Sequence, residues 1–231
     1  MALVRRHKAI VLVSGGMDSC LTAAYAYEKY EPAFLHVNYG QRTQRRELKA
    51  FNDIAKFYGV KQKLVVDISH LKQIGGSSLT DKNVSVSKVN LKTKKIPSSY
   101  VPFRNANILA IAVSWAEVIG ARAIYIGAVE EDSSGYPDCR KSFFRAYEKM
   151  IALGTKPESV IKINTPIINL SKKQIVEKSL KMNAPLHLTW SCYKSDTKAC
   201  GECDSCALRL RGFAKAGKKD PIEYKKILKY L

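Results

Sequence analysis

The sequence is poor in acidic residues and has no long apolar run. It contains 39 Lys and Arg residues against 20 Asp and Glu, a formal net charge of +19. No run approaches the roughly 18 apolar residues of a membrane span. The apolar stretch 9–13 is too short for the core of a signal peptide, and no small-residue cleavage site follows it. We therefore expect a cytoplasmic protein without membrane contact, whose partners are anionic.

Cysteines are also few, and their spacing is not that of a disulfide framework. Cys20 and Cys139 stand alone, whereas the other four fall within fifteen residues in the pattern C-x7-C-x2-C-x2-C. Four thiolates so spaced can surround one Zn²⁺ tetrahedrally, and because they leave no position open the site should be structural. An iron–sulfur cluster is the main alternative. The expected ligands are Cys192, Cys200, Cys203 and Cys206.

Basic residues follow this cysteine cluster, so a zinc module that binds nucleic acid without catalysis is a further hypothesis. The lysines of the whole chain are scattered rather than grouped in blocks, which gives this hypothesis little support. We therefore expect no direct contact with nucleic acid. The basic residues concerned are Arg209, Arg211, Lys215, Lys218 and Lys219.

Short apolar segments alternate with amphipathic segments through most of the chain. Such alternation predicts parallel strands joined by right-handed helical crossovers. The fold class expected is α/β, a doubly wound and mostly parallel five-stranded sheet with a C-terminal helical zinc-binding appendage. The predicted strands are 9–13, 32–40, 61–69, 122–129 and 159–167, and the predicted helices are 20–30, 45–59, 105–120, 139–154, 172–184 and a short tail at 220–231.

The first predicted strand ends in a glycine turn, SGGMDS at 14–19, and a helix follows. Ligands of open parallel sheets bind at this end of a strand. The glycines let a phosphate approach backbone N–H groups, and the serines and the helix N-terminus add donors and positive potential. The turn lacks the lysine of a Walker loop, and Asp18 fits beside a phosphate mainly with a bridging divalent cation or as a helix cap. An ordinary strand-to-helix turn is the alternative.

This turn is similar to the SGGxDS signature of the N-type ATP pyrophosphatases, the PP-loop superfamily, with an adenine nucleotide alpha hydrolase-like fold. Further stretches follow in the order typical of one family: NYGQR at 38–42, IPSSYVPFRN at 96–105, GAVEEDSSGYPDCR at 127–140 and the cysteine region at 191–213. The chain resembles the 7-cyano-7-deazaguanine synthase (preQ0 synthase) family along essentially its whole length. One departure is Ser133, where many members have an aromatic residue.

The resemblance implies an ATP-dependent C–N ligase that converts 7-carboxy-7-deazaguanine and ammonia to 7-cyano-7-deazaguanine (preQ0), for queuosine or archaeosine biosynthesis. The carboxylate is adenylated, ammonia displaces AMP to give an amide, and adenylation of the amide oxygen then allows loss of AMP to leave the nitrile. It further implies ATP with Mg²⁺, one Zn²⁺, free ammonia as the nitrogen donor, and a homodimer as in other members. A tRNA-thiolating PP-loop enzyme is the alternative, with Cys139 as the candidate sulfur carrier.

The resemblance assigns the turn and the helix after it to ATP. Asp18 and Ser19 would be catalytic, and Tyr39 and Gln41, which follow the second strand, would face the adenylate. The ATP segment comprises Val13, Ser14, Gly15, Gly16, Met17, Asp18, Ser19, Cys20, Leu21, Thr22 and Ala23.

Two later motifs are expected to bind the substrate. Arg104 suits bidentate contact with a phosphate or carboxylate and is expected to be catalytic, with Asn105 beside it; a helix cap is the alternative for both. After the fourth strand, a turn is the alternative to substrate contact, and the acidic residues 130–132 are either Mg²⁺ ligands or solvated. The substrate contacts implied there are Tyr136, Asp138 and Arg140.

The chain is expected to have two parts. Residues 1–185 would form the PP-loop ATP pyrophosphatase domain, and 186–231 the four-cysteine and helical region. Within the first part, 70–100 is polar, rich in Ser and Lys and without periodicity, which predicts a mobile loop.

Overall fold

The protein is described by a computed structural model that covers residues 6–81, 83–86, 96–130 and 135–228. Its centre is a five-stranded, wholly parallel sheet in the order β3-β2-β1-β4-β5, which confirms the predicted fold class. The strands are β1 (Lys8–Leu12), β2 (Glu31–Asn38), β3 (Lys63–Asp67), β4 (Ala123–Ile126) and β5 (Lys162–Asn164). The chain order reverses between β1 and β4, so this is the point where a ligand cleft opens in such sheets.

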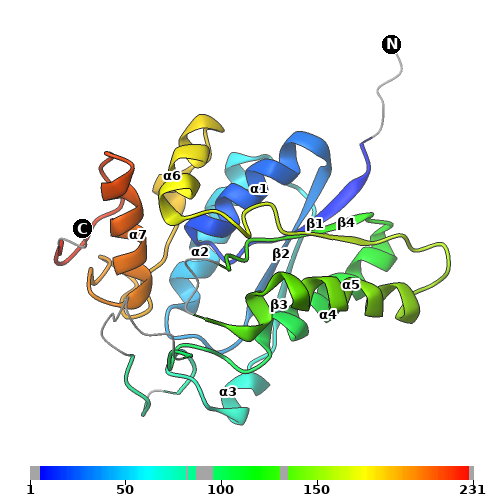
Figure 1. Ribbon diagram of the computed structural model, residues 1–231, viewed down its shortest axis with the longest axis horizontal. Coiled ribbons are helices and arrows are strands. Elements are labelled where there is room, and N and C mark those ends of the chain that lie inside the picture. The colour runs from blue at the N-terminus through cyan, green and yellow to red at the C-terminus, as the bar shows by residue number, and fades with distance from the viewer. Residues whose placement is uncertain (1–5, 82, 87–95, 131–134, 229–231) are drawn as a thin grey trace.

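Helices cover both faces of the sheet, as Figure 1 shows, with α1 and α2 on one side and α4 and α5 on the other. Alternate residues of β1 supply the two cores: Ala9 and Val11 pack on the first side, and Ile10 and Leu12 on the second. The helices are α1 (Met17–Lys29), α2 (Gln44–Phe57), α3 (His70–Ile74), α4 (Arg104–Ile119), α5 (Lys141–Gly154), α6 (Lys172–Lys181) and α7 (Asp204–Lys215), with 3₁₀ turns at Pro137–Cys139 and Leu186–Leu188.

The segment 70–100 has more structure than its composition predicts. It begins with α3, and Arg42 donates hydrogen bonds to the carbonyl oxygens of Ser78, Asp81 and Val84. Ser78 N donates to Ser98 O at 2.7 Å, which ties together the two described ends of the segment. Residues 82 and 87–95 of this expected loop lie outside the described residues.

The helical tail predicted for 220–231 is wrong for the part that the structure describes, which ends at residue 228. The backbone of this tail pairs with Ala199, whose N–H donates to Glu223 O at 2.9 Å and whose carbonyl accepts from Lys225 N at 2.7 Å. Both carboxylate oxygens of Asp220 are held by Arg209, at 2.7 and 2.9 Å. Tertiary hydrogen bonds therefore replace the helical ones.

The C-terminal region packs against the sheet domain through α6 and α7, which lie side by side (Figure 1). They approach closely at Gly212, where a Cβ atom would lie 2.9 Å from Lys172 Cβ. Ser171 and Gln174 form the capping box at the start of α6. Within the described residues, no helix is both long and apolar enough to cross a membrane.

Candidate active site

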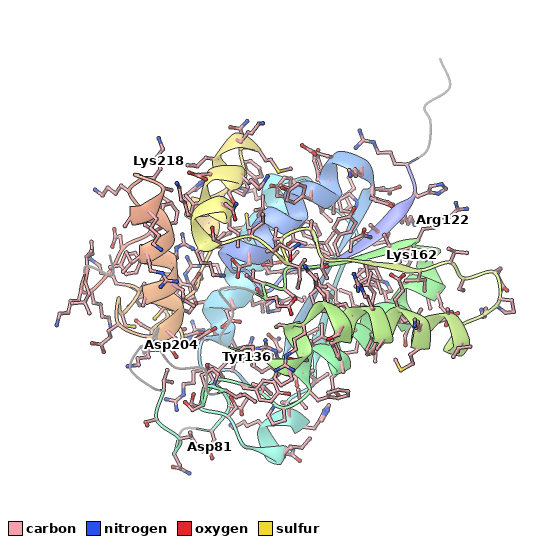
Figure 2. All side chains as sticks on the ribbon, viewed as in Figure 1. Asp81, Arg122, Tyr136, Lys162, Asp204 and Lys218 are labelled. Carbon is pink, nitrogen blue, oxygen red and sulfur yellow. The ribbon has the colours of Figure 1, made fainter. Side chains whose placement is uncertain are left out.

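A cavity of about 290 Å³ opens beside the ends of β1, β2 and β4, at the switch point of the sheet. Its lining includes residues of the glycine turn together with Tyr136 and Cys139 of the segment that follows β4. Figure 2 shows Tyr136 and Asp204, which both line the cavity, in the region between α7 and α4. Segments far apart in the sequence therefore share one site.

Hydrogen bonds from its own serines fix the conformation of the glycine turn. Ser14 Oγ donates to Ser19 Oγ at 3.1 Å, and Ser19 Oγ is also within 3.0 Å of the Gly16 carbonyl oxygen. Gly16 is the N-cap of α1 and has no side chain to satisfy the first N–H groups of that helix. The start of α1 therefore offers backbone donors and positive potential to an anion in the cavity.

Two glycines are required by close approaches. Gly15 has a φ of +90°, and a Cβ atom on it would lie 2.7 Å from the Glu47 carbonyl oxygen of α2. A Cβ on Gly127, directly after β4, would lie 3.0 Å from Ser19 N. The turn thus packs between α2 and the end of β4, and side chains at these two positions would push it out of place.

A lysine reaches the turn from far along the chain. Lys172 Nζ lies 2.6 Å from Asp18 Oδ2, with the lysine side chain only 12% exposed. The other carboxylate oxygen, Asp18 Oδ1, is buried and has no hydrogen-bond partner in the described structure. This oxygen is a suitable Mg²⁺ ligand, because Mg²⁺ in nucleotide sites takes one or two carboxylates together with phosphate oxygens.

Lys172 was not predicted from the sequence, although one local signal exists. It is the first residue of α6, where a positive charge is unfavourable to the helix dipole. A lysine in that place calls for a reason outside its own helix.

Tyr39 and Arg104 form a second pair in the cavity lining. Arg104 Nη1 donates to Tyr39 Oη at 3.1 Å, and the guanidinium lies 5.1 Å from the centroid of the same ring. Burial raises the pKa of Tyr39 to about 12, so the phenol stays protonated at neutral pH. Arg104 is the first residue of α4 and thus brings a fixed positive charge to the end of the sheet.

Asn105 and Asp138, both expected to bind substrate, are joined to each other. Asp138 Oδ2 accepts from Asn105 N at 2.9 Å, and Asn105 Nδ2 donates to the Asp138 carbonyl oxygen, also at 2.9 Å. The N-cap residue of α4 itself is Phe103, which lies in the left-handed region and makes no side-chain cap hydrogen bond. Asp138, from another segment, therefore caps the start of α4. The second oxygen, Asp138 Oδ1, is buried without a hydrogen-bond partner among the described residues.

Of the remaining predicted residues, some line the cavity and others do not. Tyr136 is buried in the lining, with its hydroxyl 2.8 Å from Ser99 Oγ. Arg140 is exposed and does not line the cavity. Gln41 is buried and does not line the cavity either; its Oε1 accepts a hydrogen bond from Tyr39 N. Glu130 is exposed and accepts a hydrogen bond from Lys141 N, and residues 131–134 are outside the described part of the chain.

The predicted ATP segment extends further along α1 than the cavity does. Six of its residues line the cavity: Val13, Ser14, Gly16, Met17, Asp18 and Ser19. The later ones lie in the helix interior, buried against the sheet or α6: Cys20, Leu21, Thr22 and Ala23.

The four predicted zinc ligands are brought together. Their Sγ atoms all lie within 4.8 Å of one another. Backbone N–H groups point at the sulfurs: Lys194 N and Cys200 N each donate to Cys192 Sγ at 3.3 Å, and Cys203 N donates to Cys200 Sγ at 3.4 Å. Hydrogen bonds among the clustered thiols lower the pKa of Cys192 and raise the pKa of Cys203 and of Cys206, because a proton on one sulfur is shared with its neighbours. The group fits Zn²⁺.

The zinc region also forms a wall of the cavity, which was not predicted. Trp190 N donates to the Gly15 carbonyl oxygen at 2.8 Å, so the chain just before Cys192 is hydrogen-bonded to the glycine turn. Trp190, Tyr193 and Asp204 all line the cavity. The cysteine motif predicts a metal site but not its contact with the glycine turn, because that contact joins segments about 175 residues apart.

Arg209 is 1% exposed and is not available to nucleic acid, contrary to one of the hypotheses above. It is paired with Asp220 and donates to Thr189 Oγ1 at 2.6 Å and to the Leu186 carbonyl oxygen at 3.2 Å. Arg209 therefore links α7 to the segments that contain Leu186, Thr189 and Asp220.

Comparison with known proteins agrees with this site. The model of the family described as queuosine biosynthesis protein QueC matches residues 8–217. A 7-cyano-7-deazaguanine synthase of Chlorobium phaeobacteroides is 58% identical over 225 residues, covering 97% of this chain and all of the relative. The synthase of Chlorobium phaeovibrioides is 60% identical over 218 residues, covering 94% of this chain and 96% of the relative.

Likeness to solved structures is weaker. An NAD+ synthetase from Burkholderia pseudomallei is 12% identical, with a TM-score of 0.43, and the match covers 93% of this chain and 75% of that one. The family is therefore shown by the sequence relatives and not by the NAD+ synthetase structure. The glycine turn, the cysteine group and the match along nearly the whole chain place this protein in the QueC family of queuosine biosynthesis proteins.

Proposed function

We propose that this protein catalyses the ATP-dependent conversion of 7-carboxy-7-deazaguanine and ammonia to 7-cyano-7-deazaguanine. The observation that carries the proposal is the cavity itself. Its lining includes the glycine turn, to which Lys172 of α6 is paired through Asp18, and a buried segment around Tyr136 that can hold a flat base. Membership of the QueC family supports the same reaction.

The turn supports binding of the pyrophosphate part of ATP. The N–H groups at the start of α1 and the hydroxyls of Ser14 and Ser19 would donate to its oxygens. Lys172 adds a positive charge that does not depend on a metal ion. Asp18 Oδ1 would hold Mg²⁺, which supplies charge neutralisation when it is bound with the nucleotide.

The residues around Tyr136 support recognition of the deazaguanine. Tyr136 and Tyr100 lie with their ring centroids 5.4 Å apart, and Ser99 and Asn105 add polar atoms to the same lining. The unpartnered Asp138 Oδ1 is an acceptor suited to the N–H groups of a guanine edge. It lies beside the lining rather than in it, so a small shift of the segment 135–140 would accompany binding.

The proposed chemistry in this cavity proceeds by adenylation. The substrate carboxylate attacks the α-phosphate of ATP, pyrophosphate leaves, and the mixed anhydride has AMP as a good leaving group. Arg104, which lines the same cavity, would orient the carboxylate and balance the charge that develops on its oxygens. Ammonia then displaces AMP, and adenylation of the resulting amide oxygen permits elimination of AMP to give the nitrile.

We also propose that the Cys192 group holds one structural Zn²⁺, and that residues 1–185 and 186–231 act as the ATP domain and the zinc-binding region of a single site. The tRNA-thiolation alternative is not favoured. Burial raises the pKa of the candidate sulfur carrier, Cys139, to about 11, and Asn105 Nδ2 lies 3.3 Å from its Sγ. A sulfur carrier needs an accessible thiolate.

The test is to incubate the purified protein with ATP, ammonium and 7-carboxy-7-deazaguanine and to measure AMP and product mass. We expect substrate-dependent AMP and a product with the mass of the nitrile. No substrate-dependent AMP would refute the proposal, and AMP formed only in the presence of tRNA would favour thiolation instead. Metal analysis should give one zinc per chain; iron would contradict the structural zinc site.

A further inference from the structure

Glu47 is a cavity residue that neither the resemblance nor the phosphate chemistry explains. It lies in the first turns of α2 and lines the cavity together with Asp18, Tyr39 and Arg104. Its backbone is packed directly against Gly15 of the glycine turn. The carboxyl group therefore belongs to the same cavity as the glycine turn and the Tyr39–Arg104 pair, which under the proposed function holds the activated carbon of the substrate.

The carboxyl group is oriented by neutral donors. Thr43 Oγ1 donates to Glu47 Oε1 at 2.7 Å, and Gln41 Nε2 donates to Glu47 Oε2 at 3.1 Å. Gln41 is fixed in turn, because its Oε1 accepts from Tyr39 N at 2.9 Å. In the described part of the chain, no lysine, arginine or histidine forms an ion pair with Glu47.

This environment makes the group easy to protonate near neutral pH. Burial raises the pKa of Glu47 to about 7, although the hydrogen bonds from Thr43 and Gln41 and the charge of Arg104 act in the opposite direction. The groups that act on it electrostatically come from three packed segments: Tyr39 after β2, Arg104 at the start of α4, and Asp196 in the zinc region. A carboxyl group of this kind suits proton transfer.

The amidation step has a proton to dispose of. At neutral pH the nitrogen donor is mostly ammonium, which has no lone pair and cannot attack the adenylated carboxyl carbon. We propose that Glu47 is a catalytic base that binds ammonium and takes a proton from it. This proposal rests on the proposed function, because it needs the adenylated substrate.

The step balances as follows. Ammonium transfers one proton to the Glu47 carboxylate, the nitrogen lone pair forms the C–N bond, and the C–O bond to AMP breaks with its electron pair leaving on AMP. The nitrogen loses its extra proton to the departing phosphate or to water. Glu47 then releases its proton to solvent, and no oxidant or reductant is involved.

The experiment compares the wild-type protein with Glu47→Gln and with a matched control on the same helix, Asp53→Asn. Asp53 is paired with Lys49 on the exposed face of α2. Rates are measured against pH for amide formation with ammonium and for hydroxamate formation with hydroxylamine, which is already an uncharged nucleophile at neutral pH. Substrate-dependent ATP–pyrophosphate exchange, which requires no nitrogen donor, is measured alongside.

With ammonium at neutral pH we expect Glu47→Gln to lose about 10²-fold or more in kcat/KM, the usual size of a base contribution. The rate of Glu47→Gln should rise about tenfold per pH unit as free ammonia forms, and in alkali it should approach the wild-type rate. The wild-type rate should instead level off once Glu47 is ionised. With hydroxylamine the loss should be less than about fivefold, and Asp53→Asn should resemble the wild type throughout.

Equal losses with both nucleophiles, or parallel pH profiles, would overturn the assignment of Glu47 as the base. Loss of pyrophosphate exchange in Glu47→Gln would overturn it too, because that result would place Glu47 in ATP binding or in the fold. Glu47→Asp, which keeps a base at a shorter reach, should fall between the two. If the wild type itself shows no substrate-dependent exchange, the proposed function fails, which is a distinct result.

Discussion

Lys172 Nζ lies 2.6 Å from Asp18 Oδ2, although 154 residues separate them. The glycine turn at 14–19 has no lysine of its own, and the start of α6 supplies one. In a Walker loop the lysine comes from the loop itself and reaches the β- and γ-phosphates. Here the positive charge depends on how α6 docks against α1.

Lys172→Met should abolish most of the activity without unfolding the protein. We expect substrate-dependent pyrophosphate release to fall by about 10²–10³-fold, the cost of removing one preorganised charged donor at a transition state. The control is Lys173→Met, the next residue, whose side chain is half exposed and paired with Glu177. Similar losses in both variants would mean that α6 matters for stability rather than for the phosphates.

Asp18→Asn tests the carboxylate that faces this lysine. The change keeps the shape of the side chain but removes the charge from Oδ1, the oxygen left without a partner. We expect AMP release to be lost, with the thermal midpoint and the zinc content close to those of the wild type. Rescue by higher Mg²⁺ would show weakened metal binding, whereas full activity at ordinary Mg²⁺ would contradict a catalytic role.

Loss of zinc should damage the active site as well as the C-terminal region. The segment before Cys192 is hydrogen-bonded to Gly15 and contributes Trp190 to the cavity wall. For Cys203→Ser we therefore expect loss of zinc, a lower thermal midpoint, and ATP binding weakened by about tenfold or more. Calorimetric titration with ATP and metal analysis measure both effects.

The control for that variant is Glu202→Gln, which leaves the backbone N–H next to Cys200 Sγ in place. It should keep its zinc and its affinity for ATP. Unchanged ATP binding in a zinc-free Cys203→Ser protein would show that the wall does not depend on the metal.

The proton equilibrium of Glu47 should also appear in stability. Its pKa is raised from 4.5 to about 7 by burial, so between these values the folded state keeps a proton that the unfolded state releases. Stability is therefore lost as pH rises through this window. Glu47→Gln, which stays neutral, should gain on the order of 2 kcal/mol relative to wild type between about pH 5 and about pH 8.

Urea unfolding of both proteins at the two pH values measures this gain. Asp53→Asn is again the control, because its carboxyl group is partly exposed and ion-paired with Lys49. A constant difference between Glu47→Gln and wild type across the range would mean that Glu47 titrates as an ordinary surface acid.

Local pattern was enough for much of this protein. Alternating apolar segments predicted the parallel sheet, and the cysteine spacing predicted that four sulfurs gather in one group. The SGGMDS turn predicted a ligand site at the end of β1, where the structure has a cavity. These features depend on residues near one another in sequence, or on a repeating period, so their physics can be read without the fold.

What the tertiary structure decided is where distant side chains meet. Lys172 faces Asp18 and Trp190 holds Gly15 because α6 and the zinc region dock on the carboxyl edge of the sheet. Asp138 caps α4 from a separate segment, and the tail after Asp220 pairs with Ala199 instead of forming a helix. No local pattern identifies the partner in any of these contacts, since each depends on packing between elements that composition and period leave unspecified.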